Sequence, residues 1–178
     1  AVLLLFAVRQ LGLSPGTIGI ALALGNAGFL GGAFVAARAP RRLGVGPTLI
    51  GAGFMIGAAY LALPFATRST AILFLVIYGF LASFGGVIYN VNARSLAQSI
   101  TPERMLGRTI ATARFVVWGT IPVGSFVGGV LGGGIGLRPT LLVAGLVGIV
   151  AFVPPLLSPV RRLGAMPALV DSVGGEDL

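Results

Sequence analysis

The polar side chains best placed to do chemistry in this sequence are amides, hydroxyls and one indole that interrupt long apolar stretches. The 178 residues include no histidine, no cysteine and no lysine. The hydroxyls therefore lack a histidine base, zinc and haem lack their usual ligands, and ATP lacks a lysine-containing phosphate loop. We expect hydrogen bonding rather than catalysis, with no cofactor and no metal site. The candidates are Asn26, Tyr78, Ser83, Tyr89, Asn90, Asn92, Thr112, Trp118 and Thr120.

The charged residues mark out the elements that must position these side chains. Twelve arginines and four acids make up only 9% of a chain that is 56% hydrophobic. Soluble domains carry about 25% charged residues, so an ordinary soluble domain and a disordered chain are both excluded. Between the charges lie five uncharged, mostly apolar stretches of 22 to 28 residues. Because about 20 helical residues cross the hydrocarbon layer, each stretch predicts a transmembrane helix.

The arginines predict the orientation of these helices. If the two sides alternate at each helix, nine arginines fall on one side and Arg9, Arg68 and Arg138 fall on the other. The positive-inside rule places the nine, and with them the C-terminus, in the cytoplasm. A composition rich in arginine, alanine and glycine but without lysine suggests a bacterial plasma membrane. A nucleic-acid surface is the alternative for a net charge of +8, but no arginine cluster has aromatic neighbours for base stacking.

The expected fold is all-α, a polytopic membrane bundle of five complete transmembrane helices plus the end of a sixth. Residues 1–8 are apolar but too short to cross, and we interpret them as the end of a truncated helix. Ser14-Pro15 predicts a helix cap followed by the first helical residue. The helices are expected at 1–8, 15–37, 47–66, 71–98, 109–131 and 139–157, within a bundle over 1–158 that a disordered cytoplasmic tail follows at 159–178.

Glycines recur four residues apart in several of these helices. Gly28 and Gly32 form such a pair in one helix, and Gly124 and Gly128 form another. Small residues at this spacing let helix backbones approach closely in lipid. Packing within one bundle is the simpler interpretation, and a sliding surface between two half-bundles is the alternative. Pro122 lacks a backbone N–H and is expected to kink its helix.

The distribution of polar residues separates the helices into two groups. Polar side chains are costly in lipid and point to surfaces that face protein or water. The helices at 15–37, 71–98 and 109–131 contain most of them and are expected to line a cavity. The helices at 47–66 and 139–157 have few and are expected to face lipid as supports.

Each candidate side chain in the spans also has a simpler interpretation. Asn26 could form a hydrogen bond to a neighbouring helix. Tyr89 and Asn90 lie in the second half of their helix and could ease its exit into water. Trp118 is too deep for an interfacial anchor, so cavity lining and core packing both remain open for it.

A longer motif joins the helices at 71–98 and 109–131. It reads NARSLAQSITPERMLGR from Asn92 to Arg108 and WGTIPVG from Trp118 to Gly124, with Gly-Gly at 128–129. This motif resembles the major facilitator superfamily of transporters, and within it the bacterial exporters that include the enterobactin exporter and macrolide-efflux proteins. The resemblance covers essentially the whole chain and implies the C-terminal half of such a transporter, from the end of its seventh helix through its twelfth.

The resemblance also implies a mechanism and roles for individual residues. Two six-helix halves would rock about a site near the membrane midplane and expose it alternately to each side. The family signature between paired helices has an aspartate where this chain has Ala37, so a charge lock through that acid is not expected. The residues expected to face substrate are Asn26, Tyr89, Asn90 and Trp118, and those expected at the cytoplasmic gate are Arg38, Arg41, Arg42 and Arg108.

The expected function is secondary active efflux of small amphipathic molecules. The expected partners are the lipid bilayer, a missing N-terminal half and a small-molecule substrate. The four acids are Glu103, Asp171, Glu176 and Asp177, so none lies in a span, and a proton-carrying group would have to come from the missing half. A non-transporting membrane scaffold or accessory subunit is the alternative. A membrane enzyme would need catalytic groups that this sequence does not provide.

Overall fold

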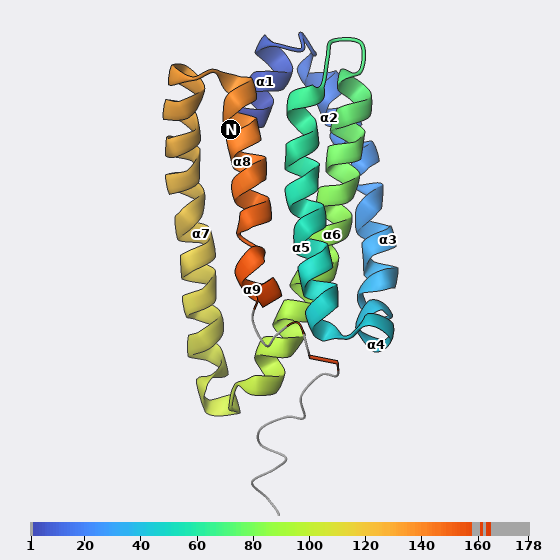
Figure 1. The fold of residues 1–178 in the computed structure, drawn as a ribbon, viewed down its shortest axis with the longest axis vertical. Helices are drawn as coiled ribbons and strands as arrows, with labels where there is room; N and C mark the ends of the chain where they lie inside the picture. Colours follow the sequence, from blue (N-terminus) through green and yellow to red (C-terminus); the bar gives the residue numbers. More distant parts are fainter. Residues whose placement is uncertain (1, 158–160, 162, 165–178) are drawn as a thin grey trace, which may run out of the picture.

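A computed structural model gives the structure of residues 2–157, 161 and 163–164 (Figure 1). Over these residues the chain forms helices and turns without a β-strand, which confirms the all-α prediction for this part of the chain. Five stretches are long and apolar enough to cross a membrane, so the predicted polytopic bundle is also confirmed. They are Pro15–Ala36, Val45–Phe65, Ala71–Ile100, Arg104–Gly134 and Leu137–Leu157.

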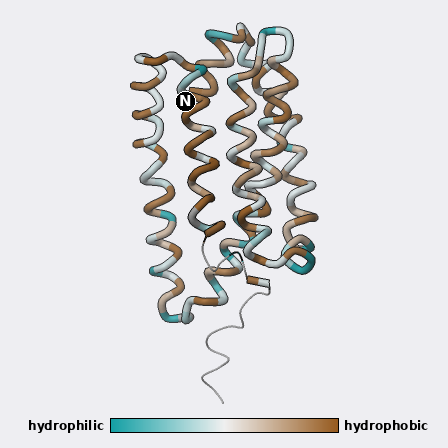
Figure 2. Tube along the Cα trace, in the orientation of Figure 1, coloured by the Kyte–Doolittle hydropathy of each residue, from teal (hydrophilic) through white to brown (hydrophobic). Residues whose placement is uncertain are grey.

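The helices run up and down the long axis of the bundle, and hydrophilic residues gather in the turns at its two ends (Figure 2). The predicted tail at 159–178 lies outside the described residues, apart from 161, 163 and 164. The elements in chain order are α1 (Val2–Arg9), α2 (Pro15–Gly25), α3 (Ala27–Ala36), α4 (Ala39–Leu43), α5 (Val45–Ala62), a short 3₁₀ helix (Leu63–Phe65), α6 (Ala71–Ile100), α7 (Glu103–Gly134), α8 (Leu137–Val150) and α9 (Val153–Leu157).

The helix boundaries differ from the predicted ones by up to six residues, and the stretches at 15–37 and 139–157 are each divided into two helices. The stretch predicted as one helix from residue 15 is interrupted at Asn26, which ends α2 and precedes α3, although its backbone N–H still donates to the Leu22 carbonyl over 2.9 Å. At the other end, α7 begins at Glu103 instead of residue 109 and continues through Pro122 as one helix. Pro102 is extended at the N-cap, where its missing N–H costs nothing, so the helix can begin directly after it.

Helix α6 lies at the centre of the packing, against α2, α3 and α5. Helix α5 lies in turn between α6 and α8 (Figure 1). The prediction that the helix at 47–66 faces lipid is wrong, because half of its most apolar window is buried, the largest share of the five spans. The reason is that α5 buries small residues such as Gly53 and Gly57 against its neighbours. A helix with few polar residues can therefore occupy a protein interior as readily as lipid.

Helix α7 is the opposite case. Within the described residues it packs mainly against α8 and, at one end, α1. None of the residues in its most apolar window is buried. It therefore stands at the edge of the bundle (Figure 1), with apolar side chains uncovered on all of its faces in the described structure.

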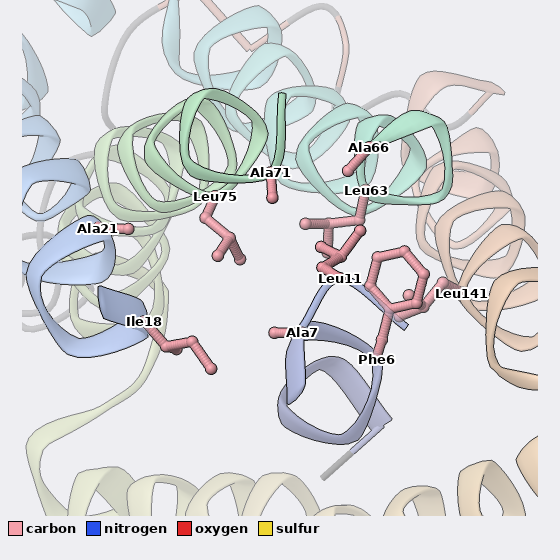
Figure 3. Close-up of a cluster of buried hydrophobic side chains, with 10 residues drawn as sticks. All are labelled: Phe6, Ala7, Leu11, Ile18, Ala21, Leu63, Ala66, Ala71, Leu75 and Leu141. Carbon is pink, nitrogen blue, oxygen red and sulfur yellow. The ribbon is translucent and has the colours of Figure 1, made fainter. Parts of the chain in front are cut away.

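The largest hydrophobic core lies at the end of the bundle that contains α1 and the start of α6. Phe6, Leu63 and Leu75 are fully buried there, and Figure 3 shows how side chains from five helical segments converge. Arg138 closes this cluster, because its Nη2 donates to the Ala66 carbonyl over 2.8 Å and its guanidinium lies 5.7 Å from the Phe6 ring centre. This end of the molecule is tightly packed.

Glycines bring α2 and α3 into backbone contact with α6. A Cβ added at Gly25 would lie 2.7 Å from the Gly79 Cα, and one at Gly32 would lie 2.7 Å from the Phe84 carbonyl oxygen. A Cβ at Gly28 would collide with the Phe80 carbonyl. No larger side chain fits at these positions without moving one of the helices. The contacts of α2 and α3 with α6 therefore depend on these glycines.

Candidate functional site

An open groove of about 500 Å³ runs along α6 on the side that faces α3. Its lining combines an aromatic ring and small apolar side chains with hydrogen-bonding groups and one charge. The lining residues are Phe29, Ser83, Gly86, Val87, Asn90, Val91 and Arg94. All but Phe29 come from α6, at spacings of three and four residues that place them on one face of the helix.

A side-chain hydrogen bond joins the break between α2 and α3 to α6. The Ser83 hydroxyl donates to Oδ1 of Asn26 over 2.7 Å. Asn26 is exposed, and its amide nitrogen makes no hydrogen bond within the described part of the chain. The bond orients the amide so that its two N–H groups are available to a ligand. Asn26 thus makes the helix-to-helix bond considered from the sequence, and its partner Ser83 lines the groove.

Asn90 and Arg94 lie one helical turn apart further along the groove. Asn90 Nδ2 donates to the Gly86 carbonyl of its own helix over 2.7 Å, which leaves its second N–H and its carbonyl oxygen for other partners. Arg94 is exposed and is the one charged residue of the lining. Residues four apart on a helix lie side by side, so both groups can contact the same ligand atoms.

The structure does not bring Tyr89 or Trp118 to this groove. The Tyr89 ring meets Phe152 edge-on, with centroids 5.6 Å apart, and packs beside the small core of Ala36, Ala52 and Ile88. Trp118 lies on α7 with 71% of its surface exposed. Of the four residues expected to face substrate, only Asn90 therefore lines the groove, and Asn26 is joined to it through Ser83.

The four arginines predicted to act at the gate lie at the same end of the bundle. Arg38 directly precedes α4, Arg41 and Arg42 lie within α4, and Arg108 lies near the start of α7, after the turn from α6 (Figure 1). Arg38 Nη1 donates to the Phe34 carbonyl over 2.9 Å, which satisfies the end of α3. We call this the arginine-rich end. Arg94 is the lining residue of the groove nearest to this end, because it is the closest of them to the end of α6.

The residues predicted for helix packing divide between two environments. Gly28 and Gly32 lie in backbone contact with α6, as described above. A Cβ at Gly128 would meet only the Val2 side chain, and one at Gly124 would meet nothing within 4 Å. The same glycine spacing thus marks a packed interface on α3 and an open face on α7.

Three side chains in or near the groove were not among those expected to face substrate, although Ser83 and Asn92 were already polar candidates. Ser83 and Arg94 share a face of α6 with Asn90, a pattern that the spacing 83, 87, 90 and 94 already contains. Asn92 is 3% exposed and donates to the Ala36 carbonyl of α3 over 3.1 Å and to the Ile88 carbonyl over 2.8 Å. It holds α3 to α6 just behind the groove, and only its polarity within an apolar helix could have signalled it.

Comparison with known families adds one finding. The family model described as Major Facilitator Superfamily matches residues 1–168. No curated protein and no solved structure matches the chain.

Proposed function

The chain belongs to the major facilitator superfamily of membrane transporters, and from that premise we propose that it exports small amphipathic molecules by alternating access. The observation that carries this proposal is the groove along α6, which leads from the Asn26–Ser83 pair to the arginine-rich end. Transport needs a polar surface within the span that a substrate can reach, and intramembrane polar groups are retained where they face such a path.

We also propose that these residues form the C-terminal six-helix half of the transporter, in the bacterial plasma membrane with the arginine-rich end in the cytoplasm. The uncovered apolar side chains of α7 support a further partner within the membrane, for which the other half is the natural occupant. The excess of arginine at one end supports the orientation. Residues 1–158 would form the membrane bundle and 159–178 a cytoplasmic tail.

The packing suggests which parts move together during transport. Helices α2, α3 and α6 are joined by glycine contacts and by the Asn92 hydrogen bond, so they are expected to rock as one rigid unit. The core around Phe6 and Leu63 closes the opposite end. Because no acid precedes Glu103, proton coupling would use a carboxylate outside these spans.

The test is transport by the full-length protein in bacteria that lack their main drug exporters. Cells producing the wild-type protein should accumulate less of some amphipathic compounds from a broad panel. Asn26→Ala and Asn90→Ala should each lower that export at least several-fold, because Asn90→Ala removes an amide from the groove and Asn26→Ala removes the amide that bonds to Ser83 of its lining. Gln98→Ala is the matched control for Asn90→Ala, since it removes an amide from the same helix outside the groove lining. Wild-type accumulation equal to that of empty cells across the panel would favour the scaffold alternative.

A further inference from the structure

We propose that the groove along α6 selects an acidic amphiphile, a molecule with an anionic group at one end and an apolar body, and that Arg94 binds its anionic group. This inference rests on the proposed transport function and names its substrate class. The occupant is a transported small molecule, and a bilayer lipid is an outcome that the test below excludes or reveals.

The charge of the groove gives the first argument. Arg94 is its one charged lining residue, and the sequence contains no acid before Glu103. A cationic amphiphile would find no counter-charge along these spans, whereas a carboxylate or phosphate would find a guanidinium that can bind it through two parallel hydrogen bonds. The second N–H of Asn90, one turn away, can donate to the same anion.

The position of Arg94 gives the second argument. Helix α6 begins at Ala71 at the opposite end, and about 20 residues of helix cross the hydrocarbon layer. Arg94, 23 residues further on, therefore lies at the level of the inner headgroups. The arginines around α4 and at the start of α7 make this end strongly positive, which raises the local concentration of anions. An acidic group can remain near water there while the rest of the molecule enters the span.

The middle of the groove fits the apolar body. Phe29, Val87 and Val91 line the stretch between the polar groups. From Ser83 to Arg94 the helix rises about 16 Å, at 1.5 Å per residue. At the far end the free N–H groups of Asn26 can donate to an acceptor oxygen. The preferred ligand is thus elongated, acidic at one end and able to accept a hydrogen bond about 16 Å away.

Binding of two matched probes tests the proposal on the purified full-length protein in phosphatidylcholine nanodiscs. Dansyl-undecanoic acid carries the anionic group, and its methyl ester has the same body without the charge. The wild-type protein should bind the acid more tightly than the ester. Arg94→Gln should weaken binding of the acid at least about tenfold, since hydrogen bonds to charged groups contribute about 1.5–3 kcal/mol, and should leave the ester unchanged. Arg94→Lys should bind the acid with an affinity between those of the wild type and Arg94→Gln. It also provides a test if Arg94→Gln fails to fold.

The matched control is Arg104→Gln, which removes the same charge at the same end of the bundle from a residue outside the groove lining. An equal loss of acid binding in Arg104→Gln and Arg94→Gln would overturn the proposal in favour of a general electrostatic field. Equal binding of acid and ester by the wild type would also overturn it. Loss of acid binding when phosphatidylglycerol is added to the nanodiscs would show that a lipid occupies the groove instead.

Transport in cells separates failure of this inference from failure of the proposed function. If the protein exports neutral or cationic compounds and Arg94→Gln does not affect that export, the proposed transport function stands and the proposed acidic substrate class is wrong. If the protein binds the acid through Arg94 but exports no compound, the proposed ligand class stands and the proposed transport function is wrong.

Discussion

Helices α6 and α7 have similar sequences in physical terms but very different surroundings. They contain 30 and 32 residues, and each interrupts an apolar stretch with amides, hydroxyls or an indole. Helix α6 packs against three neighbours and carries a groove, whereas the most apolar window of α7 has no buried residue in the described structure. Polarity within a span thus indicates a helix that avoids lipid, but it does not identify what covers the helix.

The difference between the two helices lies in their small residues and in buried amides. Glycines opposite α6 let α2 and α3 approach to backbone contact, and Asn92 adds a hydrogen bond between helices. The glycines of α7 face open space or a single side chain. Four changes, ordered by expected effect, test whether this contrast holds in the whole protein.

The largest effect is expected from adding one methyl group at the packed interface. Gly28→Ala should destabilise the protein by about 1–3 kcal/mol, because its Cβ collides with the Phe80 carbonyl and the core cannot yield without strain. Gly124→Ala makes the same chemical change on α7, where nothing lies within 4 Å of the new Cβ. It should leave stability unchanged or slightly raised, since alanine favours helix. Thermal unfolding of the two purified variants measures the contrast, and equal losses would show that α7 has a close partner beyond the described residues.

The buried amide behind the groove should have the next largest effect. Asn92→Ala removes hydrogen bonds to Ala36 and Ile88 and should cost about 0.6–1.7 kcal/mol. Asn90→Ala is the matched control, because its amide is exposed and bonds only to its own helix. Its stability should stay within about 0.5 kcal/mol of wild type. Chemical unfolding followed by tryptophan fluorescence reports both values, and a stable Asn92→Ala would disprove the role given to this bond.

The third largest effect on stability is expected from Arg138, which anchors the start of α8 to Ala66 and Phe6. Arg138→Ala removes its hydrogen bond to the Ala66 carbonyl and its contact with Phe6. Each such contact contributes about 0.5–1.5 kcal/mol, and exposure to water reduces the sum. Hydrogen exchange should accelerate near Leu63–Phe65 and the α7–α8 turn, and Arg138→Lys should restore part of the protection. Unchanged exchange in Arg138→Ala would show that the apolar core alone closes this end.

The smallest effect on stability is expected on α7. Trp118→Ala removes the largest side chain of this helix, yet 71% of its surface is exposed in the described structure. The thermal midpoint should therefore move little, with a change in stability of about 0.5 kcal/mol or less. If Trp118 faces substrate, as the family resemblance implies, export should change while stability does not. A loss of several kcal/mol would place Trp118 in a core formed with another part of the protein.

Much of this architecture could be predicted from charge positions alone. Sixteen charges in 178 residues define five uncharged stretches, and all five appear as helices of spanning length. The break at Asn26 could not be predicted, because asparagine is tolerated within helices and its effect depends on Ser83 from another segment. The burial of α5 also could not be predicted from the sequence, since an apolar helix can pack equally well against lipid and against protein.

The candidate site could be predicted only in part. Asn26 and Asn90 were identified by polarity, but Tyr89 and Trp118 share that property and lie elsewhere. Arg94 was assigned to topology because arginine near a helix end usually marks the cytoplasmic side. Its position on the same helix face as Ser83 and Asn90 supports the second role that we propose for it, and that position became visible only with the packing of α3.

The most direct test of the account is whether the groove along α6 is open to water and to substrate. The 178 residues contain no cysteine, so Asn90→Cys can serve as a single reporter in a full-length protein freed of other cysteines. A charged, membrane-impermeant thiol reagent applied from the cytoplasmic side should label it, and dansyl-undecanoic acid should slow the labelling. Val147→Cys, at a 62% exposed position in the middle of the span Leu137–Leu157, should stay unlabelled because lipid covers it. Labelling of Asn90→Cys no faster than that of Val147→Cys would contradict the account and place this face of α6 in lipid.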